Sequence, residues 1–272
     1  MDETKAYQGF LATPHISKHP HFMGMSCFFL PKPKKLNLSL TGLSPSLILG
    51  KRAEVFFTHS INLLENYKLL ASNLQLIVNK KTLGEFDFFI EELTTKQVLH
   101  IELVYKIYLY NPSFKIEEQR WIGPNRKDTL LKKVSRLKSH QLPLALTQES
   151  KLLLKSHGIH ANNLKQKVCF KAQLFIPEDK SVKPDFSSIN QACIVGYYTS
   201  YTKFTKEVYG EFLFYSPKKS IWFTPPLAEH KTWLNFEQIN LQVEKFILAK
   251  KSVLLWVKKS EHCYTRLFVV WW

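Results

Sequence analysis

The segment from Gln97 to Leu109 constrains the fold of this chain more than any other. Its side chains alternate with a period of two, with Ile101, Leu103, Tyr105, Ile107 and Leu109 on one face and His100, Glu102, Val104, Lys106 and Tyr108 on the other. Such alternation is typical of a β-strand whose two faces meet different surroundings. We therefore expect a sheet in which this strand has one apolar face and one face that carries ionisable groups.

Patterns before and after this segment predict a mixed α/β fold. Apolar residues at helical spacing predict helices at 44–70, starting at Ser44-Pro45, and at 124–140 and 148–157. Further strands are expected at 74–78, 84–91 and 167–176. Beyond residue 180 the pattern predicts strands at 209–215, 221–224, 253–258 and 264–271, and one helix at 235–249. We interpret the chain as an irregular N-terminal arm (1–43), a mixed-sheet core (44–179) and a C-terminal α+β lobe (180–272).

The charge of the chain indicates a polyanionic partner. The formal net charge is +16, and an excess of this size attracts DNA or RNA. A lysine surplus can equally reflect genome composition and solubility, and that alternative stays open. No run of about 18 apolar residues is present, so we expect no membrane span. The four cysteines lie far apart in sequence, which fits a reducing cytoplasm and predicts neither disulfides nor a zinc site.

Two acidic residues are expected to face each other across a hairpin. The strands at 84–91 and 97–109 are close in sequence and should pair in antiparallel fashion. If Glu91 pairs with Val98, Asp87 falls opposite Glu102 on the same face of the sheet. Facing carboxylates repel each other unless a proton or a cation intervenes, and carboxylate oxygens suit magnesium or manganese. The hairpin therefore predicts a metal site.

Other charged residues are expected around this pair. Lys106 follows Glu102 by four residues on the same strand face, and Glu54 points inward from the first predicted helix. The helix expected at 124–140 carries a basic flank with Arg126, Lys133 and Arg136. Two plainer readings remain open. The acids and Lys106 can form an ordinary charged face of a half-exposed hairpin, and a basic helix flank can simply be solvated.

Four segments resemble the PD-(D/E)XK nuclease superfamily in their order and residues. They are LGKRAE at 49–54, LGEFDFFI at 83–90, HIELVYKIYL at 100–109 and WIGPNRKDTLLKKVSRLKSHQL at 121–142. The resemblance is sharper to an uncharacterised bacterial family of unknown function that has been associated with that superfamily. It implies a restriction-endonuclease-like core with an additional C-terminal lobe.

The resemblance also implies roles for single residues. Asp87 and Glu102 would ligate Mg²⁺ or Mn²⁺ and, with Lys106, form the catalytic set, while Glu54 would help to hold the metal. Lys133 and Arg136 would face the phosphate backbone. The sequence departs from the superfamily at Val104, which stands where the lysine is usually found, two residues after the glutamate.

Three functions follow as hypotheses. The first is a metal-dependent nuclease or DNA-processing enzyme. The second is an inactive nuclease fold that binds nucleic acid, which Val104 and the net charge favour. The third is a module that docks a protein partner through its tryptophan-rich C-terminal lobe. Common motifs of other enzymes, such as a glycine-rich phosphate loop or His-Glu-x-x-His, do not occur.

Overall fold

The computed structural model describes most of the chain and divides it into two compact units. The described residues are 3–34, 43–44, 46–160, 163–179, 181–182, 184, 186–226, 233–261 and 263–272. The first unit comprises residues 15–105 and 132–171, and the second comprises residues 1–14, 106–131 and 172–272. The units are thus interleaved along the chain, whereas the sequence suggested consecutive segments. Lys180, the expected start of the C-terminal lobe, lies outside the described residues.

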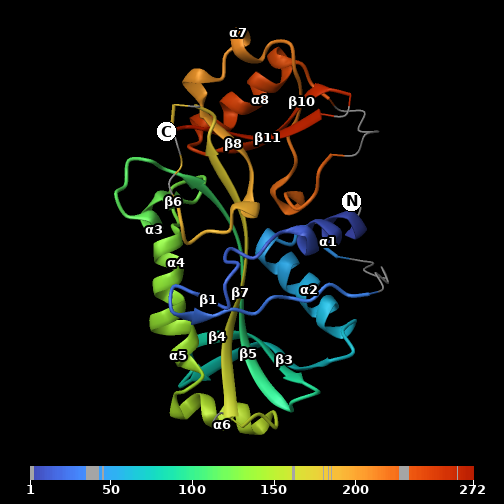
Figure 1. Cartoon of the computed structure of the whole chain (residues 1–272), viewed down its shortest axis with the longest axis vertical. Helices are drawn as coiled ribbons and strands as arrows, with labels where there is room; N and C mark the ends of the chain where they lie inside the picture. Colours follow the sequence, from blue (N-terminus) through green and yellow to red (C-terminus); the bar gives the residue numbers. More distant parts are fainter. Residues whose placement is uncertain are drawn as a thin grey trace. The chain divides into compact units, whose positions relative to one another are not determined.

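The described strands form a large mixed sheet of nine strands and a separate two-stranded ladder, β1 (His21–Phe22) with β2 (Met25–Ser26) (Figure 1). Hydrogen bonds link the large sheet in the order β3-β4-β5-β7-β8-β11-β10-β9, and β6 pairs with β5. The bounds are β3 Tyr67–Val78, β4 Lys81–Glu92, β5 Gln97–Tyr110, β6 Trp121–Ile122, β7 Leu164–Pro177, β8 Ile194–Ser200, β9 Leu213–Tyr215, β10 Val253–Ser260 and β11 Cys263–Val270. Strands β5 and β7 each contribute residues to both units. The sequence therefore predicted the α+β mixed-sheet class correctly.

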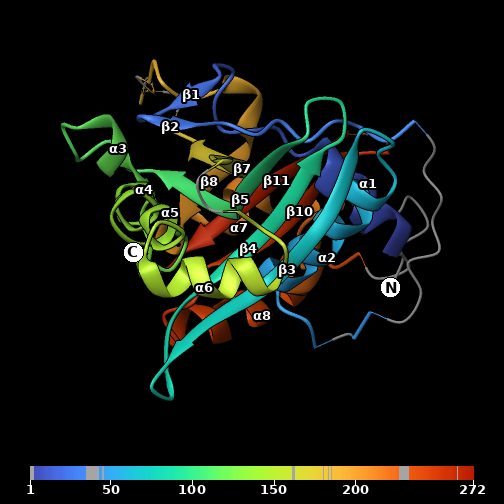
Figure 2. The same ribbon diagram turned by 90° about the horizontal axis from the view of Figure 1, so that it is seen from below.

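Helices cover both faces of β3 and β4 in the first unit. Figure 2 shows α2 (Leu49–Asn62) on one side of these strands and α6 (Gln148–Ser156) on the other. Helix α2 is amphipathic, and its buried Phe57 ring lies 4.5 Å from the ring of Phe88 on β4. Helix α6 begins at the N-cap Thr147, whose side chain accepts a hydrogen bond from the backbone N–H of Ser150.

A second cluster packs under α6 and the short helix α5 (Leu142–Leu144). Its buried members are Leu76, Phe86, Phe89, Leu144, Ala145, Leu154 and Ile159. Simple alternation along β4 would put Phe86 on the face of Phe88, but the Phe86 ring packs against the rings of Phe89 and His100. Phe86 lies beyond the last residue pair of the β4–β5 ladder, Phe88 with Ile101, so that ladder does not fix the face of its side chain.

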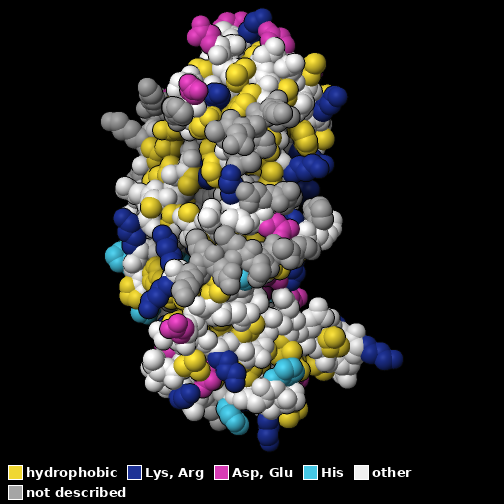
Figure 3. All heavy atoms as spheres, turned by 90° about the vertical axis from the view of Figure 1, so that its right-hand side faces the viewer, with side chains coloured by type: hydrophobic (Ala, Val, Ile, Leu, Met, Phe, Trp, Pro, Cys, Tyr) yellow, Lys and Arg dark blue, Asp and Glu magenta, His cyan; other side chains and the backbone are white. Residues whose placement is uncertain are grey.

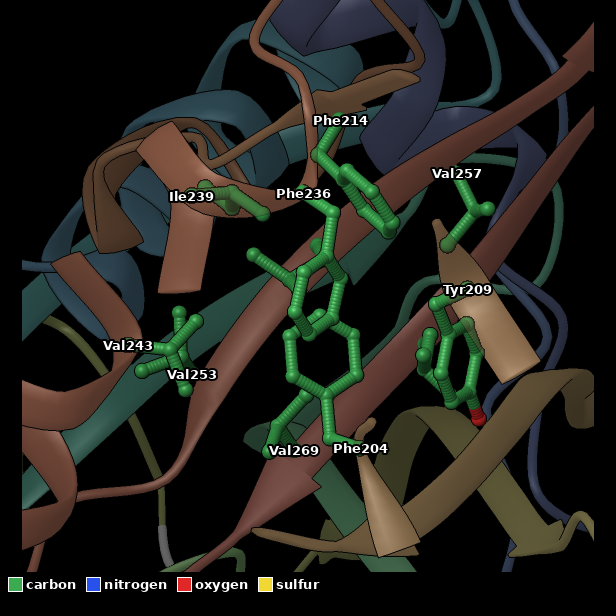
Figure 4. Close-up of a cluster of buried hydrophobic side chains, with 11 residues drawn as sticks. Phe204, Tyr209, Phe214, Phe236, Ile239, Val243, Val253, Val257 and Val269 are labelled. Atoms are coloured by element: carbon green, nitrogen blue, oxygen red, sulfur yellow. The ribbon is translucent and has the colours of Figure 1, made fainter. Parts of the chain in front are cut away.

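The core of the second unit forms between α8 (Phe236–Leu248) and strands β9, β10 and β11. Figure 4 shows its aromatic centre, where the rings of Phe204 and Phe236 lie 5.2 Å apart. Helix α8 starts with a capping box formed by Asn235 and Gln238. The remaining helices of this unit are α1 (Glu3–Ala12), α3 (Glu117–Arg120) and α7 (Lys206–Tyr209). Trp222 and Trp256 are buried, as expected for core residues.

Several predicted elements differ from those observed. The expected irregular arm contains α1, which buries Ala6, Tyr7 and Phe10. The helix expected at 44–70 spans only 49–62, and residues 67–70 belong to β3, because a short apolar run fits either element. Its expected first residue, Pro45, lies outside the described residues. Residues 221–224 do not form the expected strand, and a 3₁₀ turn at Lys219–Ile221 overlaps the start of that range.

The helix expected at 124–140 begins only at Leu130, because the residues before it form a turn and Thr129 pairs with Ile122 in an isolated bridge. Helix α4 spans Leu130–Arg136 and is followed by a π-helical turn at Leu137–Gln141 and by α5. None of the helices in the described ranges is long and apolar enough to cross a membrane. On the face shown in Figure 3, Lys and Arg side chains are scattered among apolar and neutral ones. The net positive charge therefore does not gather into one patch on that face.

Candidate functional site

Asp87 and Glu102 come together on neighbouring strands of the first unit. Strands β4 and β5 pair in the expected register, with Glu91 opposite Val98 and Phe88 opposite Ile101. The paired residues end at Phe88 and Ile101, so Asp87 and Glu102 are the next residue on each strand, and the charge of Glu102 acts on Asp87. One carboxylate oxygen of Asp87, Oδ2, accepts a hydrogen bond of 2.8 Å from the backbone N–H of Leu103. The hairpin thus holds the Asp87 carboxylate against the strand that carries Glu102.

A buried hydrogen-bond network fixes Glu102. Its side chain is fully buried, and its Oε1 lies 3.0 Å from Nε2 of the equally buried His100. The other oxygen, Oε2, accepts a hydrogen bond from the side-chain amide of Gln141. The His100 ring stacks on Phe89, and its Nδ1 lies 3.3 Å from the amide nitrogen of Gln166. Buried polar groups need such partners, and the network gives Glu102 one orientation.

The environment of Asp87 disfavours its ionised form. Burial is the largest cause, and the adjacent charge of Glu102 is the second; together they raise the pKa of Asp87 from 3.8 to about 8. The Leu103 N–H and the charge of Lys133 act in the opposite direction, while Glu54 adds to the increase. The carboxylate therefore lies where a proton or a cation is needed to compensate its charge.

Glu54 lies beside this pair and forms a small ionic cluster with Lys51 and Glu85. The ammonium of Lys51, three residues before Glu54 on α2, lies 2.8 Å from Glu54 Oε2 and 3.1 Å from Glu85 Oε1. The side-chain nitrogen of Asn73 reaches both carboxylates when the amide is oriented toward them. Burial and the charge of Glu85 raise the pKa of Glu54 against the effect of Lys51. Partial burial alone would lower the pKa of Lys51, but the two acids outweigh it and raise that pKa.

An open cavity of about 200 Å³ exposes this cluster to solvent. Its lining residues come from α2, β4 and the helical stretch that runs from the end of α4 to α5: Lys51, Gly84, Glu85, Asp87, Arg136, His140, Gln141 and Leu144. We call it the Asp87 cavity. Acidic side chains lie on its β4 wall, and Arg136 and His140 lie on the helical wall. Gly84 allows the walls to approach, because a Cβ at this position would lie 2.4 Å from Leu144.

The π-helical turn places Gln141 in the site. Gln141 links Glu102 to the basic helix, because its Oε1 also accepts a 2.8 Å hydrogen bond from the ammonium of Lys133. A regular α-helix would rotate Gln141 away from its observed direction. Turns of this kind occur often at functional sites.

The remaining predicted residues lie in the second unit. Lys106 forms an ion pair with Asp128 at 2.6 Å, and Arg126 lies over the ring of Trp272 at 5.2 Å. The structure therefore assembles Asp87, Glu102, Glu54, Lys133 and Arg136 in the first unit, whereas Lys106 and Arg126 have partners of their own in the second. Val104, at the usual lysine position, is a buried apolar residue.

Sequence reasoning missed three residues of the site: Lys51, His100 and Gln141. His100 lies two residues before Glu102 on the same strand, so the alternation of side chains already put both residues on one face. The sequence could therefore have indicated His100. Lys51 lies three residues before Glu54, a spacing at which helical side chains meet. No local pattern in the sequence indicates the π-helical turn that positions Gln141.

Of the two carboxylates, those of Asp87 and Glu102, only Asp87 reaches the cavity, because Glu102 is fully buried and both of its oxygens have hydrogen-bond partners. Magnesium is commonly held by one or two carboxylates, with waters and substrate phosphates completing its shell. Within the described ranges, no group of three or more His, Cys, Asp or Glu residues is arranged to hold a metal ion. Any ion here would therefore depend on water or substrate for most of its ligands.

Comparison with known protein families matches residues 31–270 to the model of a domain of unknown function, DUF1853. No curated protein and no solved structure shows significant similarity to the chain.

Proposed function

Because the chain belongs to the DUF1853 family, whose description states no activity, we propose from the site itself that it is a metal-dependent nuclease that hydrolyses phosphodiester bonds in DNA. The first unit would then be the PD-(D/E)XK-like core that the sequence resembles. One observation carries the proposal. Two carboxylates of like charge, Asp87 and Glu102, lie close together on neighbouring strands, and Asp87 opens to a cavity that basic side chains also line.

The chemistry is the addition of water across a P–O bond. The oxygen of water forms a bond to phosphorus, the bond from phosphorus to the leaving oxygen breaks, and that oxygen takes up a proton. A magnesium ion held by Asp87 and Glu102 would polarise the phosphate and make the attacking water more acidic. His100 and Gln141 keep Glu102 in one orientation, and the Leu103 N–H does the same for Asp87. Such preorganisation lowers the cost of reaching the transition state.

The basic side chains at the cavity support a nucleic-acid substrate. Arg136 lines the cavity, and Lys133 lies close enough to lower the pKa of Asp87. Arginine binds phosphate through two parallel hydrogen bonds, which makes it well suited to a nucleic-acid backbone. The scattered charge seen elsewhere would add attraction at longer range.

We expect Arg136→Ala to weaken binding to a short DNA duplex about tenfold and to lower the slope of log affinity against log salt by about 1, because one phosphate contact is lost. Fluorescence anisotropy at several salt concentrations measures both quantities. Lys151→Ala is the control, since Lys151 is an exposed residue of α6 that does not line the Asp87 cavity. Equal losses for the two variants would show that Arg136 contributes only general charge.

A second candidate is a nuclease fold that binds nucleic acid without cleaving it. The buried Val104 at the usual lysine position favours it. This function predicts salt-sensitive DNA binding that survives Asp87→Asn, together with intact DNA after incubation with Mg²⁺ or Mn²⁺. Binding that does not depend on salt would count against it. A protein partner for the C-terminal lobe would become the remaining proposal if no nucleic acid bound.

A further inference from the structure

We infer that Lys51 supplies the ammonium that contacts the substrate phosphate at this site, in the role for which Lys106 was expected. The inference rests on the proposed nuclease function and names the residue that would replace the missing lysine at position 104. Three observations support this inference. Lys51 lines the Asp87 cavity, its ammonium contacts Glu54 and Glu85, and Lys106 pairs with Asp128 in the second unit.

Lys51 lines the same cavity as Asp87 and is accessible from it. Its side chain is 45% exposed, although its ammonium contacts both Glu54 and Glu85. These two contacts hold the amino group at the acidic wall of the cavity. A phosphate that enters the cavity would therefore meet an ammonium already placed beside the carboxylates. Exposed ion pairs of this type are weak, so the amino group can change partners at small cost.

The opposite wall offers a second positive charge. Arg136 lines the Asp87 cavity from the helical segment, while Lys51 lines it from α2. Two cations from different elements can bind non-bridging oxygens of one phosphate, and the developing negative charge would lie between them. Lys51 acts only by its charge in this account. It neither gives nor takes a proton, so the balance of the hydrolysis is unchanged.

Lys106 has different surroundings. Its ammonium pairs with Asp128, and it is close enough to Lys219 to lower the pKa of that lysine. All three residues belong to the second unit, and Lys106 does not line the Asp87 cavity. Of these two lysines, therefore, only Lys51 lines the cavity that Asp87 also lines.

The test compares Lys51→Met, Lys51→Arg, Lys106→Met and Lys155→Met in the full chain. DNA cleavage is measured with Mg²⁺, and affinity for a fluorescein-labelled DNA duplex is measured with Ca²⁺ at several salt concentrations. We expect Lys51→Met to lower the cleavage rate about 100-fold and to weaken binding about fivefold, because a cation aimed at the phosphate is lost. Lys51→Arg should restore most of the binding. Lys155, an exposed residue of α6, should behave as wild type.

Each outcome bears on the inference. If Lys106→Met lowers cleavage and binding while Lys51→Met does not, the inference is wrong and the proposed function stands. If wild type binds DNA without cleaving it and Lys51→Met still weakens binding, the phosphate contact stands and the nuclease function fails. If wild type neither cleaves nor binds DNA, both are wrong. Thermal unfolding of each variant excludes a loss of fold as the cause.

Discussion

Asp87→Asn is expected to stabilise the folded protein at pH 8 by about 2 kcal/mol, although it removes a residue of the proposed site. The cause is the pKa of Asp87, which folding raises from 3.8 to about 8. At a pH well below 3.8 both folded and unfolded chains carry the proton, so no penalty exists. As the pH rises toward 8, the unfolded chain ionises and the folded chain does not, so stability falls. The open cavity lets water screen the carboxylate, and the expected gain is therefore smaller than the full pKa shift would give.

Urea unfolding of wild type and Asp87→Asn at pH 5, 6, 7 and 8 measures this effect. The difference between their free energies of unfolding should grow with pH, and the asparagine oxygen can still accept the Leu103 N–H. Glu91→Gln serves as the control, because Glu91 lies on the same strand and only approaches Lys96 at 3.9 Å. If Asp87→Asn is equally or less stable than wild type at pH 8, burial and the charge of Glu102 do not make the ionised Asp87 carboxylate unfavourable in the folded protein.

Glu102→Gln is expected to lower DNA cleavage at least about a thousandfold. The substitution removes one of the two negative charges that would hold the ion, so the ion would bind less well and stabilise the transition state less. A loss of several kcal/mol of transition-state stabilisation corresponds to a rate decrease of this size. Glutamine has nearly the same shape, and its single amide oxygen can still accept one of the two hydrogen bonds that Glu102 receives. Single-turnover cleavage of labelled DNA with Mg²⁺ or Mn²⁺ measures the rate.

The control for this variant is Glu92→Gln on β4. Glu92 lies near the hairpin turn, where its side chain accepts a hydrogen bond from the hydroxyl of Thr95. Circular dichroism checks that each variant is folded. Cleavage by Glu102→Gln at the wild-type rate would show that any nuclease activity of the preparation arises elsewhere.

The hairpin of the site could be predicted because local rules determine it. Two alternating segments joined by a short turn have few registers that keep their apolar faces together, and the observed Glu91–Val98 pairing is the expected one. Asp87 and Glu102 are the next residue on each strand beyond the last residue pair of the hairpin, and the charge of Glu102 acts on Asp87. The helices at 148–156 and 236–248 were also predicted closely, because caps and amphipathic patterns mark both.

The rest of the site depends on tertiary packing that sequence patterns do not encode. Gln141 reaches Glu102 only because a π-helical turn interrupts the predicted helix. Lys106 shares a strand with Glu102, yet its partner is Asp128, which follows β6 in the second unit. Sequence spacing can indicate which face a side chain occupies. It does not reveal which of several charged residues from other elements will meet it.

The most direct test of the central claim is calorimetric titration of the wild-type protein with Mn²⁺ at pH 8, with Asp87→Asn and Glu102→Gln in parallel and with a short DNA duplex present in a second series. The account predicts saturable binding by wild type that either substitution removes, because both carboxylates are needed to hold the ion. Absence of Mn²⁺ binding by wild type in both series, or equal binding by all three proteins, would contradict a metal site at Asp87 and Glu102.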